Sequence, residues 1–252
     1  MNYKSMKKNA FKAFFIALTL IFATNLGQAQ SLEEGIAAHF PKLAPDAPKG
    51  ELMGAMAQLD LLAAQHPGEW AAQYYACFAK VTVSYGLESA EQRDMLLDEA
   101  DAYAKTMMEL GAENSETFIM KAMVANGRLA VDGQARWQKY GAIFSENLEK
   151  AKALNADNPR IYYLKGTSLF YTPTMFGGGK AASVKYFEQA KPLFAKESKE
   201  SLLVPYWGNE INEYYIAECA KPGEVGMPVE EEAPKEDKKK AKKEKKKKKE
   251  KN

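Results

Sequence analysis

Residues 158–196 constrain the fold most, because two helix signals are separated there by a break that turns the chain back. An Asn-Pro pair at 158–159 is typical of a helix start, since Asn caps the first turn and Pro needs no amide donor there. A Thr-Pro pair at 172–173 ends this helix, because the residue before a proline is pushed out of helical geometry. Three glycines at 177–179 permit a tight turn into a second helix. The stretch predicts an antiparallel helix pair.

Apolar residues recur at intervals of three and four through the rest of the central chain, which predicts amphipathic helices. Short turns rich in Gly, Pro and Asn separate these segments, so consecutive helices should be antiparallel neighbours. No segment shows the sustained alternation that is typical of a strand. We therefore expect an all-α domain over residues 30–220. Its predicted parts are a short helix at 31–40, a leading helix at 51–65, helix pairs at 68–110, 114–154 and 158–196, and a closing helix near 207–219.

The pair at 158–196 resembles a tetratricopeptide repeat at its small and aromatic positions, which are Gly166, Gly178, Ser183, Phe187 and Ala190. The resemblance implies a right-handed stack of antiparallel helix pairs, an α-solenoid, in which stacking buries faces that no pair can bury alone. It also implies that Gly166 lets two helices approach closely and that Phe187 fills the contact with the next unit. Residues 172–176 would be an insertion relative to the repeat.

In such a repeat the first helix of each pair lines a concave surface. The resemblance then implies that Tyr163, Thr167 and Phe170 face this groove, while Tyr162 and Leu169 pack inside. Amphipathic aromatic side chains are common anchors for peptides. The alternative, in which nearly all these aromatics fill the core, stays open.

The first 29 residues are typical of an export signal. An apolar run from Ala13 to Ala23 is too short for the roughly 20 residues of a membrane span. Gly27 and Ala29 form a small-x-small cleavage site before Gln30, and no cysteine stands there to carry a lipid anchor. The signal predicts a periplasmic or secreted protein. The positive charges that precede the apolar run are Lys4, Lys7, Lys8 and Lys12.

Charge is distributed unevenly along the chain, although the whole sequence has a formal net charge of only +2. Residues 221–252 hold 13 lysines against eight acidic residues, whereas residues 30–220 carry a net charge of −7. An acidic body argues against nucleic-acid binding. The tail has almost no apolar content and is predicted to be disordered. Three roles stay open for the tail. It can be an inert solvated segment, a tether to an anionic envelope surface, or a segment that docks on the acidic body.

The sequence shows no catalytic or metal-binding constellation. His39 and His66 have no partner at ligand spacing on a helix face, and no serine stands in a nucleophile-elbow pattern. Cys77 and Cys219 each lie in an apolar helical stretch, which favours free thiols; a disulfide between them is the alternative. We expect no catalytic residues, no metal and no cofactor, and we do not expect an enzyme.

A second candidate site is the glycine-rich loop formed by Gly177, Gly178, Gly179 and Lys180. A phosphate-binding loop needs a glycine five residues before its Gly-Lys and a Ser or Thr directly after the lysine, and this chain has neither. A glycine-rich helix start beside a lysine can still favour an anion. The alternative is a purely structural turn with an insertion.

These observations predict a binding module. We expect an exported scaffold or adaptor that holds an unidentified partner protein or peptide in a concave helical groove. The loop also resembles that of helical-repeat partner subunits of solute-uptake systems, which have a Gly-Gly pair after an aromatic residue. This second resemblance implies an alternative, a small-ligand-binding accessory of an envelope transport or polysaccharide-handling system, with an anionic ligand near residues 172–180.

Overall fold

The computed structural model describes residues 32–44 and 46–225. Within these ranges every regular element is helical and no strand occurs, which confirms the all-α prediction for this part of the chain. The predicted signal segment 1–29 lies outside the described residues, and so does the predicted disordered tail 221–252 apart from residues 221–225, which are placed and contact the turn before α8. After a helix over residues 32–39 the elements are η1 (Phe40–Lys42), α2 (Lys49–Gln65), α3 (Trp70–Tyr85), α4 (Ala90–Glu109), α5 (Ser115–Val131), α6 (Gly133–Leu154), α7 (Pro159–Tyr171), η2 (Thr174–Phe176), α8 (Lys180–Phe194) and α9 (Asn209–Ala220).

The helix boundaries follow the capping residues. Side-chain oxygens of Asn114, Asp132 and Asn158 each accept a hydrogen bond from a backbone N–H in the first turn, at 2.9 Å. Such caps satisfy amides that have no partner inside the helix. Pro192 lies inside α8, which ends two residues later, at Phe194. No described helix has the length and apolar character needed to cross a membrane.

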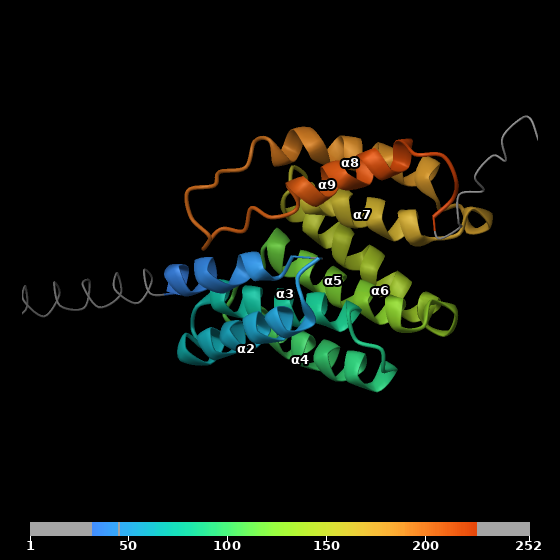
Figure 1. The fold of residues 1–252 in the computed structure, drawn as a ribbon. Coiled ribbons are helices and arrows are strands. Elements are labelled where there is room, and N and C mark those ends of the chain that lie inside the picture. The colour runs from blue at the N-terminus through green and yellow to red at the C-terminus, as the bar shows by residue number, and fades with distance from the viewer. Residues whose placement is uncertain (1–31, 45, 226–252) are drawn as a thin grey trace, which may run out of the picture.

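Helices α2 to α6, together with the helix over 32–39, form the lower part of the molecule, and we call them the first unit (Figure 1). Each helix from α2 to α6 packs against the next, and α3 also packs against α5. Helix α3 is the most enclosed, because its small residues admit neighbours on both sides while Tyr74 and Tyr75 are fully buried. The buried side chains of this unit form the larger part of one core cluster, which continues into α7, α8 and α9.

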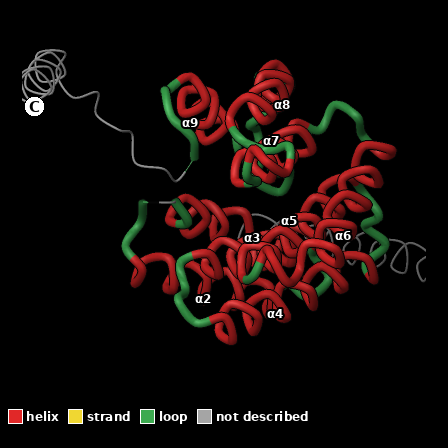
Figure 2. The backbone as a smooth tube through the Cα atoms, turned by 90° about the vertical axis from the view of Figure 1, so that its right-hand side faces the viewer, coloured by secondary structure: helices red, strands yellow, loops and turns green. Residues whose placement is uncertain are grey.

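Helices α7, α8 and α9 form an upper part, the second unit, which lies over the first in both views (Figures 1 and 2). Helix α7 packs closely against α8, and α8 packs against α9, but α7 has few close contacts with α5 and α6. Phe187 of α8 fits over Gly166 of α7, and the ring of Tyr215 stacks on Phe187 at 5.0 Å. The helix pairs are therefore not evenly spaced, and we call the contact between the two units the seam.

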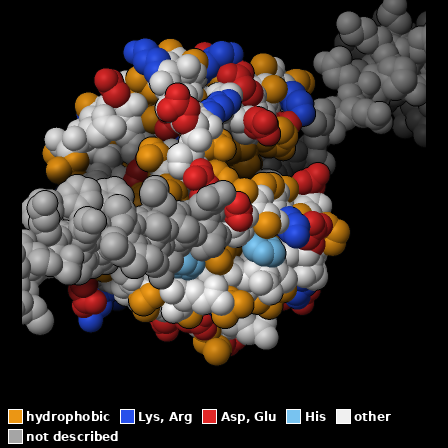
Figure 3. All heavy atoms as spheres, turned by 90° about the vertical axis from the view of Figure 1, so that its left-hand side faces the viewer, with side chains coloured by type: hydrophobic (Ala, Val, Ile, Leu, Met, Phe, Trp, Pro, Cys, Tyr) orange, Lys and Arg blue, Asp and Glu red, His pale blue; other side chains and the backbone are white. Residues whose placement is uncertain are grey.

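The segment over residues 195–208 returns from α8 to the first unit and bridges the seam. The Tyr75 hydroxyl donates to the Leu202 carbonyl oxygen at 2.7 Å, and the Leu202 N–H donates to Glu33 at 2.8 Å. The Trp207 indole N–H donates to the Tyr74 hydroxyl at 2.7 Å. Figure 3 looks at the left-hand side of the view in Figure 1. It shows hydrophobic side chains in the recess between the upper and lower parts of the molecule. The bridging segment thus closes much of the space that an open solenoid would leave empty.

The bridging segment and α9 cover the face of α7 that was predicted to line an open groove, so the predicted orientation of α7 is wrong. Tyr163 and Phe170 are only 8% and 6% exposed, whereas Tyr162 and Leu169, which were expected inside, are half-buried. Trp207 and Tyr215 cover the face that was expected to be open, with ring centroids 6.1 and 6.3 Å from that of Tyr163. Thr167 is also half-buried, and its hydroxyl donates to the Tyr163 carbonyl oxygen at 2.6 Å. Tyr163 and Phe170 therefore face packed parts of the chain, as in the alternative in which these aromatics fill the core, and Thr167 bonds to its own helix.

The two cysteines differ in exposure, which predicts different thiol reactivity. Cys77 is fully buried and donates to the Ala100 carbonyl at 3.3 Å, and burial raises the pKa of its thiol. Cys219 is half-buried beside the Ser183 hydroxyl. Because the thiolate is the reactive form, we expect Cys219 to react with a thiol reagent in the native protein and Cys77 only after unfolding. Thiol titration with and without denaturant, with Cys219→Ser as control, measures this, and two equally fast native thiols would contradict it.

Candidate functional site

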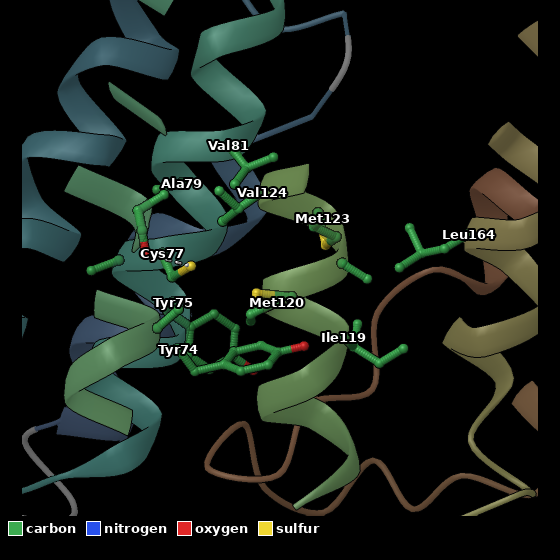
Figure 4. Packing of buried hydrophobic residues seen from close by; sticks show 14 of the residues in the cluster. Tyr74, Tyr75, Cys77, Ala79, Val81, Ile119, Met120, Met123, Val124 and Leu164 are labelled. Carbon is green, nitrogen blue, oxygen red and sulfur yellow. Dashed lines mark hydrogen bonds between the residues drawn. The ribbon is translucent and has the colours of Figure 1, made fainter. Parts of the chain in front are cut away.

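The apolar contact across the seam is small. Leu164 of α7 points toward Met123 and Ile119 of α5, as Figure 4 shows. These three side chains are at most 8% exposed, so the contact is buried, but few other residues of α7 reach the first unit. The second unit is therefore joined to the first mainly by the bridging segment, where Trp207 packs between Phe78 and Tyr163, and by polar contacts at the start of α7.

Arg160 provides the central polar contact. Its side chain is 1% exposed, and its Nη1 donates to Glu116 of α5 at 3.1 Å and to Glu197, just beyond α8, at 2.7 Å. Its Nη2 donates to the second oxygen of Glu197 at 3.3 Å. The guanidinium also lies 4.9 Å from the ring centroid of Trp207, a cation–π geometry. One buried cation thus joins two helices and the bridging segment.

Further hydrogen bonds hold the Glu116 carboxylate. Asn158 Nδ2 donates to one of its oxygens at 2.6 Å, and the Tyr74 hydroxyl donates to the other at 2.7 Å. Tyr74 in turn accepts from Trp207. We call Tyr74, Glu116, Asn158, Arg160, Glu197 and Trp207 the seam network.

Burial and the neighbouring charges shift the pKa values of Arg160 and Glu197 in opposite directions. Burial alone would lower the pKa of Arg160, but the charges of Glu116 and Glu197 raise it, so the guanidinium stays charged. Burial raises the pKa of Glu197, and Arg160 opposes that shift. Burial and the neighbouring Glu116 raise the pKa of Tyr74, which keeps its hydroxyl neutral and able to donate. The network therefore sets one guanidinium against two carboxylates, and the Tyr74 and Asn158 donors stabilise the additional negative charge on Glu116.

Arg160 is the one member of the seam network whose role leaves a signal in the sequence. Arg160 stands three and four positions before Tyr163 and Leu164, which are both buried, so it occupies a core-facing register of α7. A charged residue in such a register needs a buried partner. The partners Glu116 and Glu197 are distant in sequence, and nothing local in the sequence indicates them.

A cavity of about 790 Å³ opens beside the seam network, and we call it the seam cavity. Its apolar walls come from the bridging segment, from the ends of α6 and α8, and from the starts of α3 and α7. Carboxylates stand among these walls, and among the described residues Lys196 contributes the one cationic side chain of the lining. The apolar lining residues are Trp70, Leu154, Pro159, Leu193, Leu203, Val204 and Pro205, and the acidic ones are Glu113, Glu116, Asp157 and Glu197.

The lining limits the chemistry of the seam cavity. It contains no His, Cys, Met or Tyr side chain, and His39 and His66 both lie elsewhere. No group of three or more metal-ligating side chains gathers anywhere in the described part of the chain. The walls can therefore contact an apolar body beside Trp70, and their side chains offer a bound metal carboxylate, amide and hydroxyl oxygens but no imidazole or sulfur ligand.

The glycine-rich loop is a closed turn. The amides of Gly177, Gly178 and Gly179 donate to the carbonyls of Thr174, Pro173 and Leu169 at 2.9, 3.2 and 2.8 Å. Lys180 Nζ donates to the Lys221 carbonyl at 3.1 Å. An anion at a helix start needs free amides, and these three are already engaged. The structure thus places the predicted anion-site residues in intramolecular contacts.

No protein-family model matches the chain, and no curated protein sequence matches it significantly. Among solved structures, the HusA haemophore from Porphyromonas gingivalis is 30% identical in sequence and superimposes with a TM-score of 0.64. The match covers 76% of this chain and 92% of that protein. The chain belongs to the HusA haemophore family. The similarity to HusA extends over most of the chain, whereas the repeat signature lies within residues 158–196. The right-handed tetratricopeptide-like solenoid stays a prediction.

Proposed function

We propose that this protein is an exported binding protein whose seam cavity holds a planar, largely apolar ligand of the haem class. The observation that carries the proposal is the seam cavity: its volume of about 790 Å³ lies within the range of about 300–1,000 Å³ that is usual for small-molecule sites. The relationship to a haemophore and the predicted export signal support it. The ligand would be cargo, in keeping with the expectation of a protein that is not an enzyme.

The lining indicates how such a ligand would be held. Trp70 and Leu203 offer an aromatic face and an aliphatic face for a ring system. The carboxylates would repel a ligand's own carboxylates, which should therefore point toward Lys196 or toward solvent. Since the lining has no imidazole, thiolate, thioether or phenol, affinity should come from burial of the ring and not from coordination of its metal.

Metal-free protoporphyrin is therefore expected to bind with a Kd within a factor of about three of that of haem. Fluorescence quenching of the tryptophans measures both affinities on the same protein. Val204→Asp, which puts a charge on an exposed wall of the seam cavity, should weaken both ligands about tenfold or more. Leu61→Asp on α2, outside the cavity, is the matched control. Strong binding of haem but not of protoporphyrin would overturn this mode of binding.

A basic peptide segment of a partner protein is the second candidate ligand, and the acidic residues Glu113, Glu116, Asp157 and Glu197 in the lining favour it. This candidate retains the scaffold or adaptor function that the sequence predicts. The salt dependence of binding distinguishes the two candidate ligands. The affinity for a basic peptide should fall as the Debye length falls from about 10 Å at 0.1 M salt to about 3 Å at 1 M, because it depends on charge pairing. The affinity for a planar apolar ligand should persist, because it depends on burial of the ring.

A further inference from the structure

The turn between α7 and α8 presents two large apolar side chains to solvent. Met175 and Phe176 of η2 are 81% and 72% exposed. The turn is firmly built, because Gly177 has a φ of 81° and a Cβ at Gly178 would lie 2.1 Å from the Thr172 carbonyl oxygen. The engaged glycine amides hold it in place. An ordered turn that exposes adjacent large apolar residues is typical of an interaction site.

The last described residues lie against the same turn. The Thr174 hydroxyl donates to Glu224 at 3.2 Å, and Lys180 reaches the Lys221 carbonyl. Figure 1 shows the end of α9 and this turn together at the right-hand end of the molecule. The chain continues from this point into residues 226–252, which hold 12 lysines against seven acidic residues, and all 12 lysines follow residue 234. The described part of the chain thus ends beside an exposed apolar turn, and the lysines follow from residue 235 of the sequence.

We propose that this end of the protein docks on an anionic lipid surface, with Met175 and Phe176 entering the interfacial layer and the lysines after residue 234 pairing with headgroups. Neither signal suffices for stable attachment alone, whereas an apolar insertion combined with a polybasic segment does. Lysine clusters are attracted to anionic headgroups within a Debye length of the surface. The charge of the tail and the place where it begins favour lipid as the occupant.

A second protein fits the turn less well. Two neighbouring side chains bury far less than the roughly 1,200 Å² of a stable protein interface. The proposal also has a geometric consequence, because the turn follows the last residue of α7 while the seam cavity is lined by its first, Pro159. The 13 residues of α7 separate them by about 20 Å. Docking through the turn would leave the seam cavity open to the aqueous side. The docking is also independent of which ligand the seam cavity binds.

Co-sedimentation of the full protein with vesicles tests the proposal, using phosphatidylglycerol–phosphatidylcholine vesicles and pure phosphatidylcholine vesicles. The unaltered protein should sediment with the anionic vesicles only. Met175→Ser/Phe176→Ser should weaken this binding roughly tenfold. A variant with its lysines from Lys238 to Lys251 changed to glutamine should lose binding at 0.1 M salt. Leu61→Ser/Leu110→Ser, which removes exposed leucines at the other end, is the matched control and should bind normally.

Several outcomes would overturn the proposal. Unchanged binding of the serine variant would reduce the contact to the tail alone, and equal binding to neutral vesicles would remove the role of charge. If the unaltered protein binds no vesicles, the turn faces only solvent. If the protein self-associates and the serine variant abolishes this, the turn contacts a second copy of the chain and not lipid. Circular dichroism of each variant confirms that lost binding does not reflect lost folding. Since the variants leave the seam cavity intact, protoporphyrin binding should be the same for all of them.

Discussion

Replacing Arg160 with methionine is expected to lower the free energy of unfolding by about 3–5 kcal/mol. Methionine keeps much of the volume of arginine, but the Glu116 and Glu197 carboxylates, each 17% exposed, would lose their shared cation. An uncompensated buried charge costs far more than an exposed one. Urea denaturation at neutral pH, followed by tryptophan fluorescence, measures the change. Because the seam has little apolar contact, the second unit should also become more accessible to protease.

Arg136→Met is the matched control for this prediction. Arg136 pairs with Asp94 at 2.6 Å, but its side chain is 26% exposed, so the loss should stay within about 1 kcal/mol. A triple variant, Arg160→Met with Glu116→Gln and Glu197→Gln, should recover part of the stability, since it leaves no buried charge unpaired. If Arg160→Met and Arg136→Met cost the same, the seam network does not hold the two units together.

Gly166→Leu is expected to destabilise the protein by about 1–3 kcal/mol through overpacking. A Cβ atom at this position would lie 2.6 Å from Cε1 of Phe187, and Phe187 is fully buried beneath the stacked ring of Tyr215. The ring cannot move aside without separating α7 from α8. Chemical denaturation of the two proteins measures the difference.

The matched control for Gly166 is a helical glycine with open space around it. A Cβ atom at Gly141 of α6 would meet no heavy atom within 4 Å, so Gly141→Ala should stabilise the protein by about 0.5–1 kcal/mol. Opposite signs at the two positions are the expected result. A neutral or stabilising Gly166→Leu would mean that α7 and α8 are packed differently from the structure.

Helix positions were predictable because their signals are local. Asn158 and Asn114 cap helices where the sequence places helix starts, and the break at 172–173 coincides with the end of α7. The close approach at Gly166 and the filling role of Phe187 were implied by the resemblance to a tetratricopeptide repeat, and the structure brings these two residues together. These features depend on a residue and its neighbours within a few turns.

The orientation of α7 was predicted incorrectly because it depends on a segment with no helical signal. Residues 201–208 contain Leu202, Leu203 and Trp207, but their apolar side chains carry no periodicity that shows which surface they cover. Trp207 lies against Tyr163 from 44 residues away in sequence and against Tyr74 from 133. An aromatic residue on a helix can face a groove or a packed neighbour, and only the position of the neighbour decides between them.

The sequence by itself determined the helical class, the helix ends, the acidic body and the basic composition of the tail, because each follows from local geometry or composition. The tertiary structure alone decided that Glu116, Arg160 and Glu197 meet, that the bridging segment closes the expected groove, and that a cavity opens at the seam. Ion pairing and cavity shape act over a few ångströms in space, at any distance along the chain. No local pattern in the sequence therefore records them.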